Sequence, residues 1–286
     1  MPLTKKSNFC RLCLALVIFF AAGCKKNTET NELKIFVTES QNGLVKLEEI
    51  YTYDLNKVLK SRRVEDNWNV NGKLISEFKY YYNSQGYMDS ILTKQQSQPG
   101  SNFYYVAYKY HYDAANAPLY QVQSSKNTNT GKFEVVDSLY YVTDAAKRVT
   151  CMKRYTSFIL PRFLSDSITY SYDARGNMVL LQSYNRNRES DPFLIRYKLE
   201  NQYDDKSPPL YPQKGGFLYY SYASDYPFVN NIINQTQTGY ANPPPAINWI
   251  SGYTATVSFD AQNRPVKVVK DFGPNFSTLE TEYSYR

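Results

Sequence analysis

Aromatic and polar residues alternate along this chain in a short phrase that returns about every thirty residues. The phrase is an aromatic residue, any residue, a second aromatic residue and then Asp or Asn, as in Tyr170-Ser171-Tyr172-Asp173. Residues two apart in a strand share a face, so the two aromatics lie on one face and the residue between them on the other. Tyr and Phe also favour strands. The pattern therefore predicts a strand that ends at the Asp or Asn.

The residue that ends each phrase is a turn signal. Asp or Asn suits the first position of a type I turn, because its side chain accepts a hydrogen bond from the backbone N–H two residues later. The position three residues later should tolerate a positive φ; it is Gly or Asn in four copies, whereas Lys57, Lys147 and Ser207 fit less well. The predicted turn residues are Asp54, Asn83, Asp113, Asp144, Asp173, Asp204 and Asp260.

The regular spacing of these turns predicts the architecture. The first six lie 29 to 31 residues apart, and the last step is 56, close to two periods. Such a period indicates repeats, each long enough for a β-hairpin. Consecutive hairpins pair most readily in sequence order, and the strand twist of so many strands accumulates. We predict an all-β protein: one large, curved antiparallel sheet of seven consecutive hairpins, spiralled or partly closed.

The chain divides into four predicted parts. Residues 1–23 read as an export signal, 24–33 as a flexible polar tether and 34–286 as a single repeat domain. From about 207 to 252 the period is lost, and Asn, Gln, Gly and Pro dominate. We expect an irregular insertion there that replaces a repeat and covers part of the sheet or one of its ends. Loops of that size are often functional.

The paired aromatics are first of all packing residues, because Tyr combines a large apolar body with a polar tip and suits a half-covered sheet. A sharper hypothesis is a stacking surface for sugar rings or another flat ligand. We expect the pairs to form one stripe on one face, near the rim where the turns line up. The candidate ligand-facing residues are Tyr51, Tyr53, Tyr80, Tyr82, Tyr110, Tyr112, Tyr170 and Tyr172.

The N-terminus carries the second strong signal. Lys5, Lys6 and Arg11 precede and flank an apolar run, 12–20, which is too short to span a membrane. The sequence Ala21-Ala22-Gly23-Cys24 that follows resembles the lipobox of bacterial lipoproteins. That resemblance implies that Cys24 is acylated and begins the mature chain. It also implies a lipid-anchored protein of the outer membrane that faces the periplasm or the cell surface.

The repeat phrase itself resembles the YD repeats of Rhs-type proteins, best at Tyr170-Ser171-Tyr172-Asp173-Ala174-Arg175-Gly176-Asn177. It is still more similar to a group of uncharacterised repeat-bearing lipoproteins of Gram-negative bacteria. Rhs repeats are shorter than the spacing here, and their toxin-encapsulating shells need a far longer chain. The resemblance therefore implies β-hairpin repeats and no toxin role.

Residue types for catalysis and cofactor binding are scarce. The single histidine, His111, lies between two paired aromatics, on the face opposite them, and no G-x-S-x-G turn accompanies it. Neither Cys nor His is numerous enough for a zinc site, and no phosphate loop is present. We expect no enzyme activity, no metal and no cofactor.

The charge of the chain gives no sign of a nucleic-acid partner. The whole chain has 33 Lys and Arg against 26 Asp and Glu, a net charge of +7. Removing 1–23 takes away three basic residues and no acid, which leaves 30 against 26, or +4. That excess is modest and spread along the chain, so we expect no nucleic-acid partner.

A third short pattern joins Asp, Ser and an aliphatic residue. It occurs at 89–91, 137–139 and 166–168 and resembles an O-glycosylation acceptor motif of some Gram-negative bacteria. Two copies lie seven residues before a turn Asp, so repeat register explains them equally well. The candidate acceptors are Ser90, Ser138 and Ser167.

Three functional hypotheses follow. The leading one is a lipid-anchored, non-enzymatic envelope protein that binds or scaffolds a partner, such as a glycan or an envelope protein, through the face of its sheet. The second is an envelope glycan hydrolase that uses carboxylates whose pairing the sequence does not reveal. The third is an integral outer-membrane barrel, whose lipid-facing positions should be uniformly apolar. Both faces carry polar residues here, as in Lys79-Tyr80-Tyr81-Tyr82-Asn83.

Overall fold

The computed structural model describes residues 32–68, 72–155, 163–210, 230–241, 244, 246–274 and 276–286, and these form an all-β domain. Its strands are β1 (Glu32–Gln41), β2 (Leu44–Asp54), β3 (Leu59–Asp66), β4 (Leu74–Tyr82), β5 (Met88–Gln96), β6 (Phe103–Tyr112), β7 (Pro118–Lys126), β8 (Phe133–Thr143), β9 (Val149–Tyr155), β10 (Leu164–Tyr172), β11 (Met178–Asn185), β12 (Leu194–Tyr203), β13 (Ile232–Tyr240), β14 (Ile247–Phe259), β15 (Pro265–Asp271) and β16 (Leu279–Tyr285). The first two strand residues, Glu32 and Leu33, fall within the predicted tether 24–33; the rest of that segment, with Cys24, lies outside the described residues.

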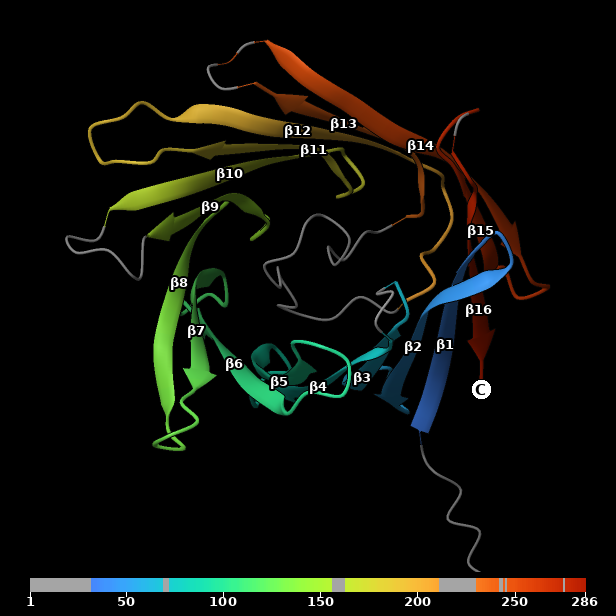
Figure 1. Cartoon of the computed structure of the whole chain (residues 1–286), viewed down its shortest axis with the longest axis horizontal. Helices are drawn as coiled ribbons and strands as arrows, with labels where there is room; N and C mark the ends of the chain where they lie inside the picture. The colour runs from blue at the N-terminus through green and yellow to red at the C-terminus, as the bar shows by residue number, and fades with distance from the viewer. Residues whose placement is uncertain are drawn as a thin grey trace, which may run out of the picture. The chain divides into compact units, whose positions relative to one another are not determined.

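These strands form one antiparallel sheet that closes into a sixteen-strand barrel (Figure 1). Each strand pairs with its neighbours in sequence, and the ring closes where β1 pairs with β16, from Ile35 opposite Tyr285 to Gln41 opposite Leu279. The predicted single antiparallel sheet of consecutive hairpins is confirmed. Its curvature goes further than a spiral, because pairing at the seam removes both sheet edges.

The seven predicted turns join β2 to β3, β4 to β5, and so on to β14 and β15. Because antiparallel strands alternate in direction, all seven lie at one rim of the barrel, which we call the Asp rim. β1 begins and β16 ends at this rim, where Lys34 and Arg286 exchange backbone hydrogen bonds of 2.7 and 2.8 Å. Both ends of the barrel's chain therefore lie at the Asp rim.

The turns have the predicted geometry. In the first, the Asp54 carboxylate accepts hydrogen bonds from the backbone N–H groups of Asn56 and Val58, at 2.9 and 3.0 Å. The fourth turn position has positive φ not only at Gly86 and Gly176, at 80° and 94°, but also at Lys57 and Lys147, at 61° and 63°. The hydrogen bonds to the carboxylate hold the turn in this conformation. They stabilise it even where the fourth position is a lysine, for which a positive φ is strained.

A β-bulge accompanies every one of these turns: the register shifts just before the second aromatic position of the phrase, as between Ser171 and Tyr172. Bulges increase the local strand twist. Seven of them at one rim help the sheet to curl until its two ends meet.

Alternate residues face the lumen or the outside. Tyr53, Ile35 and Met178 have 1%, 0% and 0% of their surface exposed. In the part of the chain that the structure describes, no element packs on the convex outer face of the barrel, so side chains this buried face the lumen. The lumen side carries three apolar clusters, centred on Tyr53 and Ile35, on Tyr108 and Ile91, and on Tyr141 and Met178.

The irregular insertion expected at about 207–252 is shorter than predicted. β13 occupies Ile232–Tyr240 and β14 begins at Ile247, so no repeat is missing. Asp204 still makes its turn contacts, but with Asn231: the Asp204 carboxylate accepts from the Asn231 backbone N–H at 3.0 Å and from its side-chain amide at 2.9 Å. The extra residues are inserted inside this one turn, and the hairpin resumes at Asn231.

Candidate functional site

The predicted tyrosine pairs lie on the lumen side near the Asp rim. Tyr51, Tyr53, Tyr110 and Tyr170 are buried in the apolar clusters, and the other four pack against them half-buried. The structure thus brings the eight residues onto one face. Their rings pack within or against the apolar clusters that line the lumen.

The second tyrosine of a phrase has a further contact that the sequence did not reveal. Its hydroxyl donates to the backbone carbonyl of the first residue of the preceding strand, as from Tyr172 to Val149 at 2.6 Å. Burial raises the pKa of the Tyr172 hydroxyl, which therefore stays a donor. The other such bonds join Tyr82 to Leu59, Tyr112 to Met88, Tyr203 to Met178 and Tyr285 to Pro265. These tyrosines tie adjacent hairpins together.

The turn carboxylates are structural. Hydrogen bonding from the Val58 backbone lowers the pKa of Asp54, and the Arg264 backbone does the same for Asp260. At the Asp173 turn the carboxylate also accepts a hydrogen bond from the fully buried side-chain amide of Asn177, at 3.0 Å. Asn177 in turn exchanges two bonds of 3.0 Å with Asn230. This network joins the Asp173 turn to the end of the insertion.

A charged cluster faces the lumen at the barrel seam. Glu49 accepts hydrogen bonds of 2.5 Å from both Tyr51 and Arg62. Burial raises the pKa of the nearby Glu39, and Lys270 opposes that shift. These residues come from β1, β2, β3 and β15, so only barrel closure assembles them. No spacing in the sequence links them, and sequence analysis did not find the cluster.

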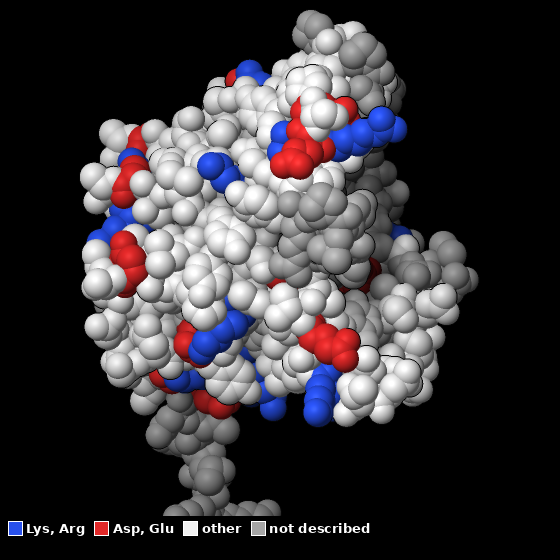
Figure 2. Space-filling model, turned by 90° about the vertical axis from the view of Figure 1, so that its left-hand side faces the viewer, with Lys and Arg blue, Asp and Glu red and all other residues white. Residues whose placement is uncertain are grey.

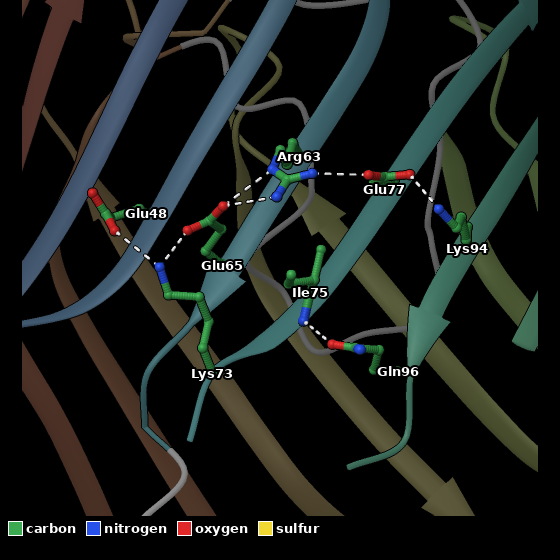
Figure 3. A network of polar contacts seen from close by, with 8 residues as sticks. All are labelled: Glu48, Arg63, Glu65, Lys73, Ile75, Glu77, Lys94 and Gln96. Atoms are coloured by element: carbon green, nitrogen blue, oxygen red, sulfur yellow. Dashed lines mark hydrogen bonds and ion pairs between the residues drawn. The ribbon is translucent and has the colours of Figure 1, made fainter. Parts of the chain in front are cut away.

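The outer face carries ion pairs. Arg63 contacts Glu65 at 2.9 Å and Glu77 at 2.8 Å, and Glu77 also contacts Lys94 at 3.2 Å (Figure 3). Lys73 extends the chain of contacts to Glu65 and Glu48. In the ladder, Glu77 pairs with Arg63 on one side and Lys94 on the other, alternating with the buried Phe78. The network therefore stands on the side opposite the lumen.

Further ion pairs occur elsewhere on the outside, between Lys109 and Asp89 at 2.5 Å, Lys198 and Glu200 at 2.8 Å, and Lys267 and Glu280 at 2.7 Å. Figure 2 shows one side of the barrel, with basic and acidic residues side by side on an otherwise uncharged surface.

An aromatic row also lies on the outer face, across β6 to β9. It consists of His111, Tyr120, Tyr140 and Tyr155, with successive ring centroids 4.2, 5.8 and 5.3 Å apart. His111 lies opposite Tyr120 in the ladder, and Tyr120 opposite Tyr140. The sequence placed His111 on this face correctly, but the three tyrosines lie outside the repeat phrase and were missed.

The candidate acceptors Ser90, Ser138 and Ser167 lie within strands, half-buried, on the outer face. The Asp before Ser138 faces the lumen, where Asp137 is buried and contacts Arg154 at 2.6 Å. The ion pair in the lumen therefore explains the aspartate at this position without any modification of Ser138.

The described residues hold no group of three or more His, Cys, Asp or Glu side chains placed to bind a metal. Within the same residues, no helix has the length and apolar character of a membrane span.

The comparisons with known proteins bear on the fold. No protein-family model and no curated protein sequence matches the chain. Among solved structures, a porin-like protein from Bacteroides uniformis superposes with a TM-score of 0.50 at 8% identity, over 90% of this chain and 96% of that one. The similarity covers most of the chain. It supports the barrel architecture of the third hypothesis better than the binding role of the first.

Proposed function

We propose that the chain is a lipid-anchored, water-soluble barrel of the cell envelope that binds a partner through its outer face and has no enzyme activity. The observation that carries this proposal is where the charges lie: ion pairs lie on the outer face of several strands, whereas the buried apolar and aromatic clusters face the lumen together with the charged cluster at the seam. A membrane-spanning barrel needs the reverse, an apolar outer band around a polar interior.

The cost of placing this outer face in lipid can be estimated from three basic residues near strand centres. Arg63, Lys153 and Lys198 occupy the middle of β3, β9 and β12. At a bilayer midplane each costs about 2–4 kcal/mol, so together about 6–12 kcal/mol, which is similar to the whole stability of a typical domain. Several strands are also short for a membrane span: β9, β15 and β16 have 7 residues each, against about 9–11 for a spanning strand.

The lipid anchor is the part of the proposal that rests on the sequence alone, on the lipobox resemblance at Cys24. Acylation would hold a barrel with a polar outside at the membrane without inserting it.

The second candidate is an integral outer-membrane barrel, which the similarity to a porin-like protein favours. The two candidates differ in what the outer face contacts, water or lipid.

Purification of residues 25–286 without detergent separates the candidates. A water-soluble barrel gives a monomer on gel filtration whose β-sheet circular dichroism and elution volume are unchanged by added detergent. An integral barrel aggregates without detergent and elutes with a micelle when detergent is present.

A further inference from the structure

The outer aromatic row differs from the rest of the outer face in its charge. Lys94, Lys109, Lys198 and Lys267 each have a carboxylate partner. Lys153 lies directly opposite Tyr140 in the ladder, with Ser167 on its other side. Among the described residues Lys153 has no ion pair, and the outward positions of β7 to β11 in the ladder carry no carboxylate.

The row is also accessible. Tyr140 has 45% of its surface exposed and Tyr155 37%. The two rings meet edge to face, with an angle of 80° between their planes. In this arrangement the rings do not stack on each other, so neither ring hides both faces of its neighbour. The row crosses four neighbouring strands, which at about 4.8 Å per strand step makes it about 14 Å long, more than a single sugar ring.

We propose that this row, with Lys153, binds an acidic glycan: the aromatic rings contact the apolar faces of the sugars, and the lysine pairs with a sugar carboxylate. Lys153 beside exposed tyrosines supplies the charge complementarity, and the hydroxyls of Ser138, Ser167 and Thr169 on the same face supply hydrogen-bonding groups. Aromatic residues in such sites combine an apolar face with a polar edge. This inference rests on the proposed function, because it needs an outer face in water.

The test uses oligogalacturonate as the acidic probe and maltoheptaose as the neutral one, with residues 25–286 and isothermal titration calorimetry in 150 mM salt. Oligogalacturonate should bind more tightly. Lys153→Gln should remove the preference for the acidic probe. Tyr140→Ala should weaken binding at least about fivefold, the effect of truncating a central aromatic contact.

Lys109→Gln is the matched control, because Lys109 lies on the same outer face but is paired with Asp89. It should leave binding unchanged. Failure of a folded, monomeric protein to bind oligogalacturonate would overturn the proposal, as would equal losses in the Lys153 and Lys109 variants. Dimerisation that Tyr140→Ala abolishes would show that the row instead contacts a second copy. A protein that is folded only in micelles would instead count against the proposed function itself.

Discussion

Replacing Asp173 with Ala should destabilise the barrel more than the same change at Asp113. Each carboxylate accepts two backbone hydrogen bonds in its turn: Asp113 from Ala115 and Ala117, both at 2.8 Å, and Asp173 from Arg175 and Asn177 at 2.9 and 2.8 Å. Since water can reach these exposed turns, losing the two bonds should cost about 1–2 kcal/mol at either site.

Asp173 has two further partners. One is the exposed guanidinium of Arg175, 3.5 Å from its carboxylate, and an exposed ion pair of this kind contributes less than about 1 kcal/mol. The other is the side-chain amide of Asn177, which donates to the Asp173 carboxylate at 3.0 Å, and Asn177 is fully buried. In the Ala variant one N–H of this buried amide loses its acceptor, which lowers the free energy of unfolding by about a further 1–3 kcal/mol. We therefore expect a loss of about 2–5 kcal/mol for Asp173→Ala against about 1–2 kcal/mol for Asp113→Ala.

Equilibrium urea unfolding of residues 25–286, followed by fluorescence, measures both values. Asp173→Asn is the informative rescue: it keeps the acceptor for the backbone bonds but turns a donor toward Asn177, so it should recover only part of the loss. Equal destabilisation by the two Ala variants would refute the reasoning that the Asn177 network adds stability.

Three further predictions concern a turn, the seam and the anchor. Gly176→Val should lower the free energy of unfolding by about 1–2 kcal/mol, because a β-branched residue resists the φ of 94° found there; an unchanged urea midpoint would contradict this. Glu39→Gln should stabilise the barrel at neutral pH, because burial raises the Glu39 pKa above its ordinary value of 4.5 and folding then penalises the charged form. The penalty grows as pH rises through the raised pKa and is absent well below pH 4.5, so a stabilisation that persists undiminished at acidic pH would refute this assignment. Cys24→Ala should release the protein from the membrane fraction of cells, because acyl chains are its proposed anchor; retention after a high-salt wash would count against lipidation.

The repeat hairpins could be predicted because their signals are local. Asp173 and Gly176 lie in one turn, and the paired tyrosines mark one face of one strand. The insertion was placed too broadly for the same reason: β13 contains Gln235, Thr236 and Gln237 and no aromatic phrase, so nothing local identifies it as a strand. This segment becomes a strand because it pairs with β12 on one side and β14 on the other.

Barrel closure and both candidate sites depend on distant contacts. Thr281 lies beside Glu39, 242 residues earlier in the chain, only because β16 pairs with β1. Tyr120, Tyr140 and Tyr155 form a row only because three consecutive strands, β7, β8 and β9, lie in register. No periodicity within one repeat reveals either arrangement.

The most direct test of the account is whether the outer face contacts water when a membrane is available. Residues 25–286 can be mixed with phospholipid vesicles, floated on a density gradient and treated with a water-soluble amine reagent. We expect the protein to stay at the bottom, with Lys153 and Lys198 modified to the same extent with and without vesicles. Flotation of the protein together with protection of these two lysines would show that the outer face lies in lipid, and would contradict the account.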